Sequence, residues 1–254
     1  MSMPHARPLC LSSLLLAAAC SLIQRHPEPK PGMSQILVEV KALPKTGIKP
    51  PQREPGSGYG GMYASVEEDW RYRRVDYADL QDVVVLLEGG ALPGPAPPHA
   101  PRLVAAREHD LITLDHDQVL IAPDGRLELH NRTDRPLHFY STSEAWHWLE
   151  LTVPPASGAT AAAPAPGQHE LLCEEDEALK TTVVCAPCGA VARSGDELLF
   201  DDLPPGEYRV LVIAPRLPAF AATVKTRAGE RTTVAARLTV NDLPSGRAGD
   251  HPAP

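Results

Sequence analysis

The stretch VLIAPDGRLELHNRTDRPLHFYS, residues 119–141, decides the fold. Its opening apolar run is followed by Asp124-Gly125, a pair typical of a tight turn between two strands. In the next segment, RLELHN, Leu127 and Leu129 alternate with polar residues, which indicates a strand with one buried face. A polar turn then leads into LHFYS. The stretch therefore predicts consecutive antiparallel strands joined by short turns.

Further short strands are predicted on both sides of this stretch. They are VVVLLEG (83–89), LITLD (111–115), HWLELTV (147–153), HELLC (169–173) and KTTVVC (180–185). Residues 154–167, rich in Ala and Pro, are interpreted as a loop. Strands of this length and spacing predict an antiparallel sandwich or barrel, and no long stretch with helical periodicity competes.

A second, smaller β unit is predicted after these strands. GDELLFDDLPPGEYRVLVIAP (195–215) contains two strands around a Pro-Pro-Gly turn, and residues 220–240 contain two more around Gly229. The expected organisation is a leader at 1–20, a tether and lead-in at 21–78, a first sandwich at 79–184, a second at 185–243, and a tail at 244–254. Ile36 to Val40 is a candidate strand within the lead-in.

The first twenty residues predict export. Arg7 precedes an apolar run from Leu9 to Leu16, which is too short to span a bilayer. The sequence from Ala17 to Cys20 is similar to a bacterial lipobox, which implies cleavage before Cys20 and acylation of that residue. Ordinary secretion is the alternative. The expected location is the periplasm or the outer membrane, as a lipoprotein.

Charge and motifs exclude several functions. The net charge is −8 with no basic block, so nucleic acid is not an expected partner, and contact with a membrane is expected only through the lipid anchor. The chain has no GxSxG, HExxH or glycine-rich phosphate loop, and no Ser/His/acid set can be nominated, so we do not expect an enzyme. The sequon Asn131-Arg132-Thr133 is interpreted as a coincidence of composition.

Residues 119–141 resemble the bacterial cupredoxin pattern of a strand, a turn, a strand ending in Asn, and a polar turn leading to His, Tyr and Ser. With VVVLLEG before them and the segment from Cys173 after them, they are similar to exported cupredoxins of the methylamine-utilisation type. LPPGEYRVLVIAP (203–215) resembles the transthyretin-like regulatory domain of carboxypeptidases. The resemblance covers about residues 80 to 240. It implies an all-β fold, with a cupredoxin-like sandwich followed by a small prealbumin-like sandwich.

This resemblance also implies where a copper centre would lie. A type 1 site uses a Cys thiolate, two His and a weak axial Met. Cys173 stands at the thiolate position, but Asp176 stands at the second His position and Leu179 at the Met position. The first His position falls on Leu137. His138 is one place late, and a shift of one residue turns a side chain to the other face of a strand.

The resemblance therefore implies a degenerate site with no metal cofactor. Copper remains the alternative, held by Cys173 together with His138, His147 or His169. The leading hypothesis is an exported, lipid-anchored, non-enzymatic module that acts in binding or assembly in the cell envelope. Its partner is left open between an envelope protein and a carbohydrate. The alternative hypothesis is an electron-transfer or copper-handling protein.

Cys185 and Cys188 have the CxxC spacing. In thioredoxin-like enzymes this motif precedes a helix, whereas here GAVARSGDELLF predicts a turn and a strand. A disulfide between Cys185 and Cys188 is the expected state, and pairing of Cys173 with one of them is the rival connectivity. A thiol oxidoreductase is the third functional hypothesis.

Overall fold

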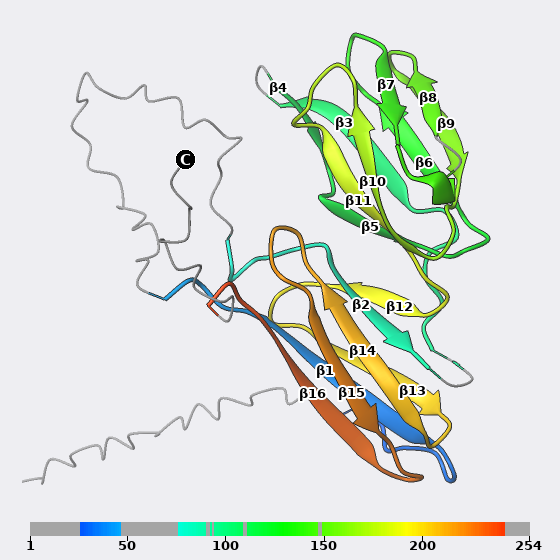
Figure 1. Ribbon diagram of the computed structural model, residues 1–254, viewed down its shortest axis with the longest axis vertical. Helices are drawn as coiled ribbons and strands as arrows, with labels where there is room; N and C mark the ends of the chain where they lie inside the picture. The colour runs from blue at the N-terminus through cyan, green and yellow to red at the C-terminus, as the bar shows by residue number, and fades with distance from the viewer. Residues whose placement is uncertain are drawn as a thin grey trace, which may run out of the picture.

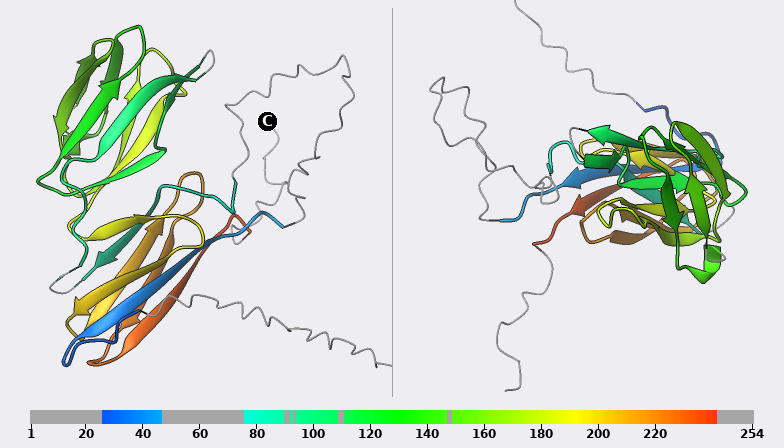
Figure 2. Two further views of the ribbon diagram at one scale, coloured as in Figure 1. Left: turned by 180° about the vertical axis from the view of Figure 1, so that it is seen from behind. Right: turned by 90° about the horizontal axis from the view of Figure 1, so that it is seen from above.

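The computed structural model describes residues 26–46, 76–89, 92, 94–108, 111–146 and 149–241. Figure 1 shows two β sandwiches, one above the other, and Figure 2 shows the same two bodies from behind and from above. The expected all-β class with two sandwiches is confirmed. Within the described residues, no helix is both long and apolar enough to cross a membrane.

The lower body, which we call the base sandwich, takes strands from both ends of the described chain. Its strands are β1 (Ser34–Ala42), β2 (Val83–Glu88), β12 (Gly189–Ala192), β13 (Glu197–Leu203), β14 (Glu207–Ile213), β15 (Phe220–Lys225) and β16 (Arg231–Leu238). They form two sheets with the orders β13-β1-β16 and β12-β2-β14-β15. Phe200 and Tyr208 are the largest side chains fully buried between these sheets.

The upper body, which we call the insert sandwich, is formed entirely by the chain between β2 and β12. Its strands are β3 (Arg102–Glu108), β4 (Leu111–Leu114), β5 (Gln118–Ile121), β6 (Arg126–Asn131), β7 (Leu137–Tyr140), β8 (Glu150–Val153), β9 (Ser157–Ala162), β10 (Gly167–Cys173) and β11 (Lys180–Cys185). The sheet orders are β5-β11-β10-β7-β8 and β4-β3-β6-β9. The pairs β3/β6 and β5/β11 are parallel, and the other pairs are antiparallel.

The pairing of β2 departs from the expected domain boundaries. We expected residues 83–89 to open the first sandwich, but β2 pairs with β14 and β12 of the base, with Val85 opposite both Val212 and Ala190. The reason is burial on both faces, since Val83 to Leu87 are all buried. Such a strand has a continuous apolar run, and that run does not identify its partners.

The N-terminal lead-in also differs from the expected tether. β1 is the centre of a three-stranded sheet, and His26 and Lys30 in the chain before it contact β13. The Gln35 amide nitrogen donates to the Pro27 carbonyl (3.1 Å) and to Oδ1 of Asp201 (2.9 Å). His26 Nε2 lies 2.9 Å from Oε2 of Glu197. Three parts of the expected organisation lie outside the described residues. They are residues 21–25 of the tether, residues 47–75 of the lead-in, and the tail at 244–254.

The two sandwiches meet in a small apolar joint. Its buried members are Val84, Leu86, Leu120, Val184, Ala186 and Ile213. At its edge, the buried Gln118 amide donates to the carbonyls of Asp82 and Ile213, both at 3.1 Å. The insert is therefore seated on the base by shared apolar packing and by a side chain that bonds to two segments of the base.

The prediction that residues 154–167 form a loop is wrong. This segment contains β9, which pairs with β6 over its whole length, from Ser157 opposite Asn131 to Ala162 opposite Arg126. Its sequence, SGATAA, has no large apolar side chain and so lacks the alternation from which a strand is predicted. Ladder hydrogen bonds to β6 and the small Ala159 and Ala161 on its inner face make it a strand nonetheless.

We predict that a fragment of residues 185–243, the expected second domain, does not fold alone. Without β1 and β2, both base sheets lose an internal strand; β12, β13 and β16 are left without ladder partners, and only the β14/β15 hairpin remains paired. The ¹⁵N–¹H correlation spectrum should have the narrow amide dispersion of an unfolded chain, whereas the full chain should be well dispersed. A dispersed, cooperatively unfolding fragment would contradict the insertion topology.

Candidate functional site

The place where the resemblance puts copper lies where β7 and β10 meet. Cys173 pairs with Phe139 across these strands and is buried. Leu137 and Leu179, at two of the expected ligand positions, are both in the core of the insert sandwich. His138 is turned away from that core and is partly exposed, as the shift of one residue predicted.

Two carboxylates occupy the space around Cys173. Oε2 of Glu175 accepts a hydrogen bond from the Cys173 thiol (3.1 Å) and another from the backbone N–H of His138 (2.8 Å). Oε2 of Glu174 lies 2.6 Å from Nδ1 of His138. We call Cys173, Glu174, Glu175 and His138 the carboxylate latch, because the two acids join the ends of β7 and β10.

The latch changes the acidity of its members. Burial, and next the hydrogen bond to Glu175, raise the pKa of the Cys173 thiol to about 12. Burial alone would raise the pKa of the Glu175 carboxyl, but the hydrogen bonds from His138 and Cys173 outweigh it and lower that pKa. The hydrogen bond to Glu174 raises the pKa of His138. The arrangement favours a protonated thiol beside an ionised carboxylate.

Asp176, at the second His position, and His169, a candidate ligand, have structural roles. Oδ1 of Asp176 accepts from the backbone N–H of Ala178 (2.9 Å) in the turn after β10. His169 is buried, with Nε2 2.8 Å from the Ala165 carbonyl and Nδ1 3.0 Å from the Ser143 hydroxyl, so both ring nitrogens are occupied. His147 lies outside the described residues. Among the described residues, no three His, Cys, Asp or Glu side chains are grouped as metal ligands. These residues do not fit a type 1 copper centre.

The structure does not bring Cys185 and Cys188 together. Cys185 is buried in the core of the insert sandwich, whereas Cys188 is buried in the core of the base sandwich. All three cysteines in the described part of the chain, Cys173 included, are free thiols, so neither expected disulfide is formed. Cys20 lies outside the described residues. The CxxC segment is one of the crossings between the sandwiches, and its two thiols fill different cores.

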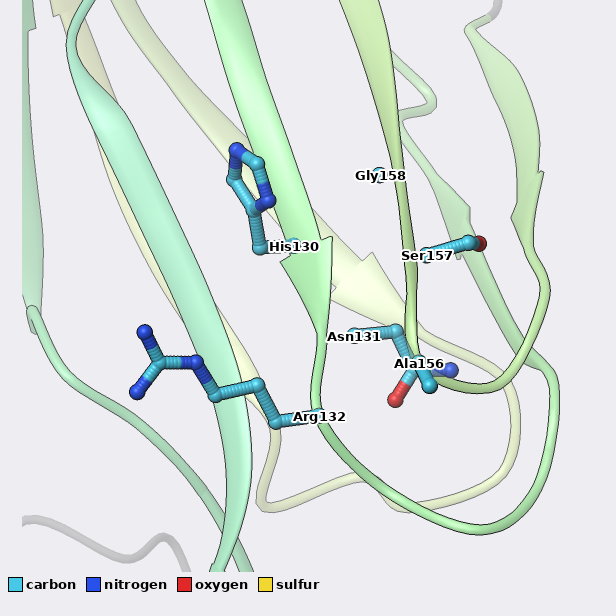
Figure 3. A pocket seen from close by; sticks show the side chains of 6 residues that line it. All are labelled: His130, Asn131, Arg132, Ala156, Ser157 and Gly158. Atoms are coloured by element: carbon cyan, nitrogen blue, oxygen red, sulfur yellow. The ribbon is translucent and has the colours of Figure 1, made fainter.

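Sequence reasoning missed a cationic hollow on the outer face of the β4-β3-β6-β9 sheet. A depression of about 420 Å³ is lined by His130, Asn131, Arg132, Ala156, Ser157 and Gly158. Figure 3 shows the His130 and Arg132 side chains on one side of β6 and Gly158, on β9, on the other. A second depression of about 330 Å³ adjoins it and shares Arg132; its other lining residues are Arg102, Val104, Ala106, Thr113 and Asp115.

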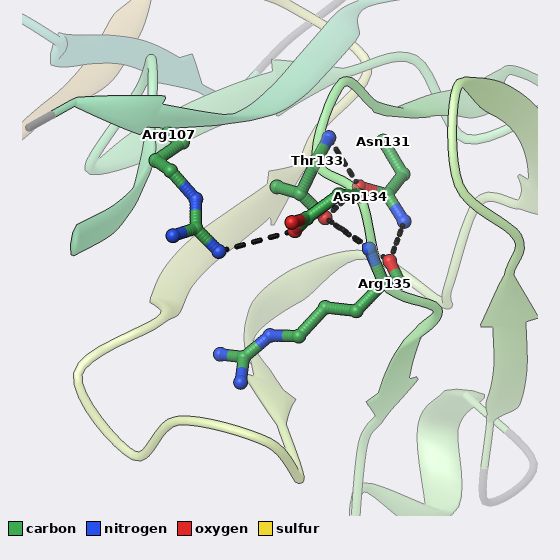
Figure 4. A network of polar contacts seen from close by, with 5 residues as sticks. All are labelled: Arg107, Asn131, Thr133, Asp134 and Arg135. Carbon is green, nitrogen blue, oxygen red and sulfur yellow. Dashed lines mark hydrogen bonds and ion pairs between the residues drawn. The ribbon is translucent and has the colours of Figure 1, made fainter. Parts of the chain in front are cut away.

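A polar network fixes the turn that carries Arg132 (Figure 4). The buried Asn131 amide donates to the carbonyls of Arg135 (2.8 Å) and Val153 (2.9 Å). Its oxygen accepts from the backbone N–H (2.9 Å) and the hydroxyl (2.7 Å) of Thr133. With both amide hydrogens engaged and almost no exposed surface, Asn131 is unsuited to accept a glycan, which agrees with our interpretation of the sequon.

Comparisons with known proteins give structural likeness only. No family model matches the chain, and no curated protein matches it. Several solved structures of amicyanin mutants are similar. A methionine-to-alanine mutant with Cu(I) is 11% identical, with 38% of this chain and 97% of that chain covered and a TM-score of 0.31. An oxidised methionine-to-leucine mutant is 12% identical, with 40% and 99% covered and a TM-score of 0.31. A reduced tryptophan-to-tyrosine mutant is 10% identical, with 35% and 83% covered and a TM-score of 0.30.

We predict that Asn131→Asp destabilises the protein by about 2–4 kcal/mol, because a carboxylate cannot donate to the two buried carbonyls. Urea unfolding at neutral pH measures the change. Arg107→Gln is the control, since it removes only the exposed ion pair with Asp134 (3.1 Å) and should cost at most about 1 kcal/mol. Equal stability of Asn131→Asp and wild type would show that the network does not hold the turn.

Proposed function

We propose that this protein is an exported, lipid-anchored, non-enzymatic β module that acts in binding or assembly in the cell envelope, and that its cupredoxin-like sandwich does not use a copper centre. The carboxylate latch carries this proposal. Glu175 accepts hydrogen bonds from the Cys173 thiol and from the backbone of His138, at the place where the resemblance implies a metal.

The donor chemistry at this place supports a metal-free role. A type 1 centre needs a thiolate and two imidazoles in a trigonal arrangement. Here the Cys173 thiol donates a hydrogen bond to a carboxylate, while Leu137 and Leu179 supply apolar packing. His138 is the one imidazole of the latch, and its Nδ1 is engaged by Glu174. Copper would have to displace both carboxylates and would still lack a second imidazole.

Acylation of Cys20 would place the base sandwich close to the membrane surface. Five residues, 21–25, separate Cys20 from His26, which is the first described residue and lies against Glu197 of the base. Fully extended, such a segment reaches roughly 18 Å. In that arrangement the insert sandwich, seated on the base through the joint, would extend away from the anchored segment and present its outer face to partners in the envelope.

We expect no stoichiometric copper binding by the purified protein. Titration with Cu(II) and Cu(I), with the visible spectrum and metal content recorded, should show no intense thiolate-to-copper band. The Glu175→Ala variant is titrated in the same way, because it removes the carboxylate that accepts the hydrogen bond of the Cys173 thiol while leaving Cys173 in place. A band in wild type that disappears in Cys173→Ser would support the copper-binding alternative and refute the metal-free proposal.

The anchor is tested separately. Cells that express the full chain and are fed a radiolabelled fatty acid should label the wild-type protein and not Cys20→Ser, since acylation requires the cysteine sulfur and the new N-terminus. The wild type should fractionate with membranes, and the variant should not. Labelling that persists in Cys20→Ser, or a soluble unlabelled wild type, would refute lipid anchoring but would leave the copper result untouched.

A further inference from the structure

The surface of the described residues favours polar recognition. Val191 is the one large hydrophobic side chain among them that is strongly exposed, at 46%. Apolar docking faces need a contiguous patch of such side chains. The described surface therefore offers charged and hydrogen-bonding groups for binding, and not an apolar patch.

The cationic hollow is a concentration of positive charge on a protein of net charge −8. Arg102 on β3, with His130 and Arg132 on and just after β6, belongs to the outer face of one sheet. Val104 and Gly158 flank His130 on the neighbouring strands. The guanidinium groups of Arg102 and Arg132 thus come from β3 and from the end of β6, and Arg132 lines both adjoining depressions. Figure 3 shows the first of the two depressions.

The donors are available for a ligand. Nη2 of Arg102 lies 3.3 Å from Nδ1 of His130, and because a guanidinium only donates, Nδ1 accepts in this contact. The remaining N–H groups of Arg102 have no partner within the described residues. Likewise, the exposed guanidinium of Arg132 makes no hydrogen bond or ion pair there. Arginine presents planar, paired donors that match carboxylate and phosphate oxygens.

The depression is open at Gly158 because glycine has no side chain. A Cβ at this position would lie 3.1 Å from Nδ1 and 3.2 Å from Cε1 of His130, and 3.2 Å from the Leu129 carbonyl oxygen. Any side chain here would therefore press on the His130 ring. At the rim, Ala156 has a φ of 51°, a left-handed conformation that is unfavourable for alanine.

The nearby carboxylates limit what the hollow can hold. Oδ1 of Asp115 accepts from the backbone N–H of Val104 (2.7 Å), and Oε2 of Glu128 lies 3.7 Å from Nε2 of His130. Asp115 is engaged by that hydrogen bond, and both carboxylates would repel an extended polyanion. The arrangement suits one small group bearing negative oxygens.

We propose that this hollow binds a single oxyanion, a carboxylate or a phosphate group, through Arg132 with support from Arg102, whose guanidinium is positioned by its contact with His130. The inference goes beyond the proposed function, because the site would exist whether or not the chain is lipid-anchored or binds copper. Its ligand is a small molecule, or one charged group of a larger molecule.

The test is a titration of ¹⁵N-labelled protein with phosphate and, separately, with acetate, each against sodium chloride of equal ionic strength. We expect saturable shifts of the His130, Arg132 and Gly158 amides in the millimolar range. Saturation by phosphate alone would identify a phosphate site, and saturation by acetate alone would identify a carboxylate site. Absence of saturation by both anions would overturn the proposal.

Two variants separate the site from general charge effects. Arg132→Gln should weaken binding about tenfold or more, because a charge-assisted contact is lost. Arg135→Gln, which removes the same charge from an exposed side chain outside the hollow, should change binding less than about twofold. Equal weakening by both substitutions, or undiminished binding by Arg132→Gln, would refute the assignment. Gly158→Ala should also weaken binding, without unfolding the protein, as its Cβ enters the depression.

Discussion

Burial of β2 on both faces is the constraint on which the rest of the structure depends. Val83, Val85 and Leu87 face the core of the base sandwich, whereas Val84 and Leu86 face the joint with the insert. A strand with two apolar faces cannot be exposed on either side without a large cost in buried area. The base therefore needs the insert to cover β2, and the insert needs β2 as its seat.

The sequence predicts individual strands better than their partners. Alternation in RLELHN identifies β6, and the apolar run at 83–87 identifies a buried strand. The partners of β2 and β1 lie more than a hundred residues away along the chain, and a local pattern carries no information about such pairing. β9 could not be predicted for a different reason. Its strand conformation is stabilised by pairing with β6, and its small alanines give no hydrophobic alternation from which a strand could be recognised.

The same distinction applies to the candidate sites: features set by the period of one strand could be predicted, and features that depend on neighbouring strands could not. The turn of His138 away from the core could be predicted, since it depends only on the period of a strand. Its bond to Glu174 depends on how the end of β10 meets β7, so the acidic run after Cys173 gave no indication that two of its members form a latch. Nor could the cationic hollow be predicted, because its residues come from β3, β6 and β9, and the sequence of β9 predicts a loop.

Asn131 connects these two features. Cys185 pairs with Gly167 and Ile121 beside the joint, so Cys173, at the other end of β10, lies at the end of the insert away from the base. The β6–β7 turn lies at that same end, with Arg132 of the hollow at its start and His138 of the latch just beyond it. By bonding to the carbonyls of Arg135 and Val153, Asn131 fixes this turn against the β8–β9 turn. One buried amide thus positions both the carboxylate latch and the cationic hollow, while the opposite end of the insert is committed to the joint.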